Sequence, residues 1–136
     1  MRPFKKLAAA AAILAGLVAT SAQAETWKCA FKPSRGDGTP QVVIIQLGAS
    51  GGRTMVLDGL IQNYVGKPVE ARSVRNTTST LSVRYDLPSV KDNKGQWIPG
   101  IVYNVYIEKS NGKSRVTATP SGNYRDVRST GTCKRK

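Results

Sequence analysis

The chain has 136 residues with 21 lysines and arginines, 8 aspartates and glutamates and no histidine, which gives a net charge of +13 at pH 7. Without histidine and with only two cysteines, Ser-His-Asp and Cys-His catalysis and the usual zinc sites are excluded. Most hydrolytic chemistry is thereby removed, and we expect a basic protein that is not an enzyme.

The first 24 residues have the pattern of a secretory signal peptide. Basic residues and an apolar run at 7–18 precede Ala22-Gln23-Ala24, an A-x-A cleavage site. The run is shorter than the roughly 20 residues that cross a bilayer as a helix, so no transmembrane anchor is expected. Cleavage leaves a single domain at 25–136, periplasmic or secreted, with a net charge of about +10 once the three basic residues of the signal are removed.

Two cysteines stand near opposite ends of the exported chain, Cys29 and Cys133. In an oxidising compartment a disulfide between them is the expected state, and two free thiols or intermolecular pairing are the alternatives. The Cα atoms of a disulfide usually lie roughly 4.4 to 6.8 Å apart, so the bond would place the first and last strands side by side. Such a bond would close a barrel or a sandwich.

Short alternating or β-branched runs, separated by turn residues, fill the exported chain. The first, at 26–32, places Trp27, Cys29 and Phe31 on one face. Further strands are expected at 41–47, 53–58, 69–75 and 80–87, in a hairpin over 100–120, and at 124–133. At 60–74 a one-turn helix and an irregular strand both fit. The pattern predicts an all-β fold, a small antiparallel β-barrel or closed sandwich of about seven to eight strands.

The hairpin over 100–120 carries the strongest local signal. Asn111-Gly112 is a preferred pair for a two-residue type I′ turn, in which both residues have positive φ. That turn places Val116 opposite Ile107, with an apolar face and a polar face on which Glu108 meets Arg115.

The carboxylates are scattered along the chain. Asp37, Asp58 and Asp92 are expected in turns, and Glu108 and Asp126 have arginine neighbours. This arrangement favours neither a glycosidase pair nor a calcium loop. We therefore predict no catalytic residue, no metal ligand and no cofactor.

Positive charge is the one functional signal. If the disulfide joins the terminal strands, their outward cations and the C-terminal tail form one anion-binding patch: Lys28, Lys32, Arg128, Lys134, Arg135 and Lys136. Such a patch attracts an anionic polymer or lipopolysaccharide. The alternative is a solvated face that keeps the protein soluble. Nucleic acid is not expected, because Tyr106 is the only predicted outward aromatic near these charges.

The interior offers a second hypothesis. About eight strands close a barrel that is filled by side chains or holds one small molecule. Four aromatic residues are predicted to face it: Trp27, Phe31, Tyr85 and Tyr103. Plain core packing is the simpler interpretation of these residues, and a small-molecule carrier is the alternative.

Short motifs resemble small periplasmic or secreted β-proteins of Gram-negative bacteria that have no assigned activity. The motifs are Trp27-Lys28-Cys29 after the signal peptide, the hairpin segment 105–112, and Gly131-Thr132-Cys133-Lys134. This resemblance implies an uncharacterised non-catalytic protein.

The layout is also similar to that of periplasmic inhibitors of c-type lysozyme, small β-barrels whose inhibitory loop carries Ser-Gly-x-x-Tyr. Here Ser50-Gly51-Gly52-Arg53-Thr54 lacks the tyrosine, and Ser121-Gly122-Asn123-Tyr124 is one residue short. Lysozyme is itself basic, so charge repulsion opposes the pairing. Inhibition of this type stays a minor alternative to binding an anionic envelope component.

Overall fold

The computed structural model of the chain describes residues 25–33, 38–49, 52–122 and 125–136, and the predicted signal peptide lies outside them. Nine strands form one sheet in the order β4-β3-β2-β1-β11-β10-β9-β6-β5. Their bounds are β1 (Glu25–Phe31), β2 (Val42–Ala49), β3 (Arg53–Asp58), β4 (Val69–Glu70), β5 (Ser73–Asn76), β6 (Thr80–Leu87), β9 (Ile101–Glu108), β10 (Lys113–Pro120) and β11 (Val127–Arg135). A small separate sheet holds β7 (Val90–Lys91) and β8 (Trp97–Ile98), and the helix α2 (Gly59–Tyr64) follows β3.

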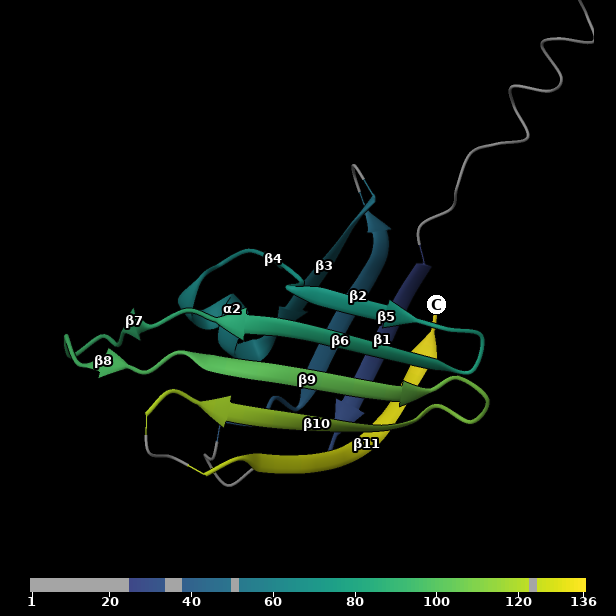
Figure 1. Cartoon of the computed structure of the whole chain (residues 1–136). Coiled ribbons are helices and arrows are strands. Elements are labelled where there is room, and N and C mark those ends of the chain that lie inside the picture. The colour runs from purple at the N-terminus through teal and green to yellow at the C-terminus, as the bar shows by residue number, and fades with distance from the viewer. Residues whose placement is uncertain (1–24, 34–37, 50–51, 123–124) are drawn as a thin grey trace, which may run out of the picture.

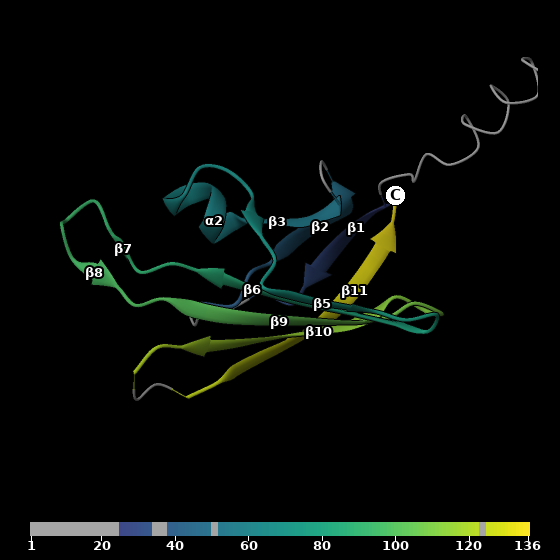
Figure 2. The same cartoon turned by 45° about the horizontal axis from the view of Figure 1, so that its top comes forward.

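The large sheet is antiparallel and curls so that its two halves face each other across the core. In Figure 1, β6, β9 and β10 lie in front of β1, β2 and β3, and Figure 2 shows the same two layers after rotation. The all-β prediction is confirmed. No helix among the described residues is long and apolar enough to cross a membrane.

Strand alternation supplies the core, as predicted. Inward positions of β1 and β6 are buried, while the residues between them are exposed or half-buried. The largest fully buried side chains come from both halves of the sheet and from α2: Tyr85, Tyr103, Ile45, Ile61, Leu81, Leu87, Ile107, Val43, Val56, Val83, Val105 and Val116.

The terminal strands are neighbours. β1 pairs with β11 from Trp27↔Arg135 to Phe31↔Gly131. Cys29 and Cys133 are direct partners in this register and form a disulfide, with Cα atoms 3.9 Å apart. The predicted disulfide and the adjacency of the two terminal strands are therefore confirmed.

The two outermost strands of the order, β4 and β5, are consecutive in the chain and separated only by Ala71 and Arg72. The Ala71 N–H donates to the Thr54 carbonyl of β3 at 2.8 Å, and the Arg72 N–H donates to the Arg84 carbonyl of β6 at 2.7 Å. One short segment thus hydrogen-bonds to both ends of the curled sheet.

The strand count is higher than the seven to eight predicted. The chain forms eleven strands in the described residues, nine of them in the large sheet. The additional strands arise because the region predicted at 69–75 divides into β4 and β5, and because β7 and β8 form a two-residue ladder around the expected loop at 91–95. Runs of two to four residues are too short to show alternation.

The predicted register of the β9–β10 hairpin is wrong by two residues. Val116 pairs with Val105 rather than Ile107, and the loop comprises four residues, 109–112. Asn111 does not adopt the positive φ of a type I′ turn, because only glycines do so among the described residues. Its Oδ1 instead accepts the Lys113 N–H at 2.8 Å. A shift of two keeps every side chain on its predicted face.

Gly112 ends this loop with φ +75° and docks it onto the disulfide-bearing strand. The Cys133 N–H donates to the Gly112 carbonyl at 2.7 Å. A Cβ built at Gly112 would overlap the Cys133 carbonyl oxygen. Both the backbone conformation and the close approach therefore require glycine here.

We predict that Gly112→Ala lowers the free energy of unfolding by more than about 1 kcal/mol, measured by urea denaturation of the oxidised protein. Gly95→Ala is the matched control, because Gly95 has φ +77° and a Cβ added to it would meet nothing within 4 Å. The control carries the conformational cost without the clash. An equal loss of stability in both variants would contradict the close approach.

Candidate functional site

Four of the predicted anion-binding residues lie together on the outer face of β1 and β11. Lys28 and Lys134 are direct cross-strand partners, and both are exposed. The Lys32 N–H donates to the Thr130 carbonyl at 3.0 Å, which places Lys32 beside β11. Arg128 is exposed one outward position before Thr130 on β11. The disulfide beneath thus gathers the four cations on one surface.

Arg135 lies on the opposite side of β11 from these four residues. Its Nε is 2.8 Å from Glu25 Oε1, and its guanidinium lies 4.9 Å from the centre of the Trp27 ring. The charge of Arg135 is therefore paired locally. Lys136 is exposed at the end of β11, where its N–H donates to the Thr26 carbonyl at 2.8 Å.

Two further cations on the same outer face were not part of the predicted patch. Lys113 and Arg115 of β10 pair with Thr132 and Thr130 of β11, and both are exposed. The predicted register had paired Arg115 with Glu108. In the structure Arg115 lies opposite Tyr106, with its guanidinium 5.1 Å from the ring centre. The alternation along β10 predicts that Lys113 and Arg115 face outward, but it does not predict that β10 pairs with β11.

Together these residues form what we call the cation ring: Lys28, Lys32, Lys113, Arg115, Arg128 and Lys134. Directly opposed and diagonal positions on a sheet lie roughly 5 to 8 Å apart, and four of the six steps around the ring are of this kind. A fifth step joins Lys113 to Arg115, the next outward residue of β10. Two members of the ring, Lys32 and Lys113, line a surface hollow of about 550 Å³ together with Ala30, Thr130 and Thr132. Within the described part of the chain, no salt bridge joins a ring member to a carboxylate.

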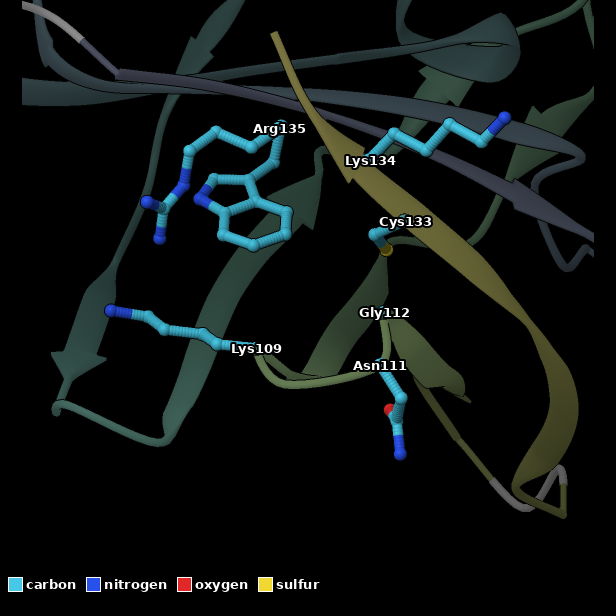
Figure 3. A pocket seen from close by; sticks show the side chains of 7 residues that line it. Lys109, Asn111, Gly112, Cys133, Lys134 and Arg135 are labelled. Carbon is cyan, nitrogen blue, oxygen red and sulfur yellow. The ribbon is translucent and has the colours of Figure 1, made fainter.

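A second pocket, of about 490 Å³, lies where the β9–β10 loop meets the ends of β1 and β11 (Figure 3). Lys109 and Arg135 extend to the same side of it, whereas Lys134 points away. Lys109 Nζ donates to Asn76 Oδ1 at 2.5 Å and to the Thr77 carbonyl at 2.6 Å. Lys109 and Arg135 therefore both have partners within the protein. The contacts of Lys109 hold the β9–β10 loop in place.

Asp58 was expected in a turn, but its side chain is 3% exposed at the end of β3. Its Oδ1 accepts the Ile61 N–H at 2.7 Å and caps α2, and its Oδ2 accepts the Tyr85 hydroxyl at 2.8 Å. Burial raises the pKa of Asp58, and the hydrogen bonds oppose that shift. Burial and the Asp58 carboxylate raise the pKa of Tyr85 well above its usual value. The pair joins the short helix to the core.

The four predicted interior aromatics are all buried. The Tyr85 and Tyr103 rings stack with centroids 5.0 Å apart, and the Tyr103 hydroxyl donates to the Gly38 carbonyl at 2.8 Å. These contacts fill the space between the two halves of the sheet, as core packing requires.

We predict that the stability contributed by Asp58 depends on pH. Because its pKa is raised in the folded state, this contribution is complete below the unfolded value and is lost as pH rises through the folded value. The unfolding free energy of the protein relative to Asp58→Asn should therefore fall as pH rises above about 4, the value of an unfolded aspartate. Asp126→Asn, at an exposed aspartate, controls for the lost charge. A difference that rises with pH would overturn the assignment.

Known proteins give no direct guide to the cation ring. Neither the family models, nor the curated proteins, nor the solved structures match this chain. The resemblance to small periplasmic proteins therefore stays a prediction, and the function has to be argued from the residues themselves.

Proposed function

We propose that this protein is a non-catalytic exported protein that binds an anionic component of the cell envelope. The cation ring is the binding surface. Six outward cations gather on and beside three adjacent strands, and no salt bridge joins any of them to a carboxylate within the described residues. This single observation carries the proposal, because a uniform cluster of one sign creates a local potential that concentrates counter-ions.

The placement of Lys28 opposite Lys134 supports the same view. Like charges directly opposite each other on a sheet destabilise it. A bound polyanion would remove that repulsion, so binding and folding favour each other. A surface that serves only to keep the protein in solution gains solubility from dispersed charge and does not need lysines opposite each other.

Nucleic acid fits this surface less well than an envelope polyanion. Proteins that bind single strands present several aromatic rings for stacking. On the outer face near the ring, Tyr106 is half-buried and Arg115 already lies over its ring. The packed interior, with its stacked tyrosines, likewise favours function on the outside over a carried small molecule.

The scaffold in this proposal is a closed barrel in an oxidising compartment. Taking β4 and β5 as one bent strand gives eight strands in chain order, closed between β1 and β11. The hydrogen bonds of Ala71 and Arg72 to both β3 and β6 support this closure. A disulfide is typical of exported proteins, which supports the periplasm or the cell exterior as the location.

We predict salt-dependent binding of inorganic polyphosphate, measured by titration at several salt concentrations. Lys28→Gln combined with Lys134→Gln should reduce the slope of log affinity against log salt by about 2, since each phosphate contact contributes about 1. Lys67→Gln combined with Lys94→Gln is the control, because both lysines are exposed outside the ring and the net charge is the same.

Equal losses of affinity in the two double variants would mean that only net charge matters, and would contradict a localised patch. Binding that does not weaken between low and moderate salt would contradict the electrostatic basis of the proposal.

A further inference from the structure

An apolar strip borders the cation ring on the side of β2. Val42 and Ile44 form this strip on the outer face of β2, and Leu57 of β3, which is partly buried against the core, borders it. Ile44 lies between Lys28 of β1 and Leu57 of β3 in register, and Val42 lies opposite Ala30, which lines the hollow. Val42 is 41% exposed, and the other two are half-buried.

The strip lies directly beside the ring, because Ile44 is the cross-strand partner of Lys28. Val42 is one of three large hydrophobic residues exposed among the described residues, and it stands one strand from the hollow. Neighbouring strands are about 4.8 Å apart, so cations and apolar side chains meet within the width of a single amphiphilic molecule. A purely hydrophilic polyanion would leave the strip in water.

We propose that the cation ring and the apolar strip together dock the protein on a membrane surface whose lipids carry phosphate headgroups. The inference rests on the proposed function and specifies its partner as an anionic amphiphile. In this arrangement the phosphates lie among the lysines and arginines of the cation ring and the threonine hydroxyls of the hollow. The first carbons of the acyl chains lie against Val42 and Ile44.

Charge complementarity selects this occupant. Arginine pairs with phosphate through two parallel N–H donors, and lysine serves as a compact point charge, so both suit a dense array of phosphates. Apolar side chains beside basic ones are typical of surfaces that bind the membrane–water interface. There the burial of apolar side chains and the attraction between basic side chains and anionic lipids both contribute to binding.

The test is co-sedimentation of the oxidised protein with vesicles of phosphatidylglycerol and phosphatidylcholine, against pure phosphatidylcholine. We expect binding only to the anionic vesicles, and a loss of roughly five-fold per neutralised lysine in Lys28→Gln/Lys134→Gln. Lys67→Gln/Lys94→Gln should retain most of the binding. This comparison tests the headgroup contacts.

The apolar contact is tested by Val42→Ser, which should weaken vesicle binding roughly three- to ten-fold while leaving polyphosphate affinity unchanged. Val74→Ser is the matched control, because Val74 is 39% exposed on β5, outside both the ring and the strip. Thermal unfolding of each variant confirms that it is folded.

The outcomes separate the two proposals. Binding of polyphosphate without binding of anionic vesicles overturns the membrane inference and leaves the proposed function standing. Equal effects of Val42→Ser and Val74→Ser on vesicle binding also overturn it. If neither polyphosphate nor vesicles bind, the proposed function itself fails.

Discussion

The covalent joint between β1 and β11 is the constraint on which the remaining structure depends. It links residues 104 positions apart, and closing so long a loop is worth about 4 to 5 kcal/mol, a large share of the roughly 5 to 15 kcal/mol that stabilises a domain. Lys28 and Lys134 precede and follow its two cysteines, so the bond beneath holds the strands together against the repulsion above. Gly131, beside the joint, lets the two backbones approach, since a Cβ there would overlap the Ala30 carbonyl.

Much of this architecture was readable from the sequence because it rests on alternation with a period of two. The inward faces of β1 and β6 followed from their apolar positions, and the disulfide followed from two cysteines in strands at the chain ends. The strand pairs that the prediction missed are two to four residues long, where alternation carries almost no information. The hairpin register failed because Gly112 could serve a two-residue or a four-residue loop, and its contact with Cys133, a long-range one, decided between them.

The candidate site was only partly predictable for the same reason. Lys28 and Lys134 could be placed together through the cysteines beside them, whereas Lys113 and Arg115 join the ring only because β10 pairs with β11. The predicted patch includes Arg135, although its alternation along β11 sets it on the other side, next to Glu25. Asp58 looked like an ordinary turn residue, and only the fold brings Tyr85, 27 residues away in the chain, to its carboxylate. The sequence shows where charged residues stand, but it does not show which residues the fold brings next to them.

The short segment between β4 and β5 has a consequence for the behaviour of the protein at high concentration. Open sheet edges template the addition of strands from other molecules, which is a common route to fibrils. Here the amides of Ala71 and Arg72 already donate hydrogen bonds to β3 and β6, so these two N–H groups are not free to pair with another molecule. For a protein exported as proposed, with no chaperones that consume ATP around it, this arrangement leaves only the short strands β4 and β5 as outermost strands of the large sheet.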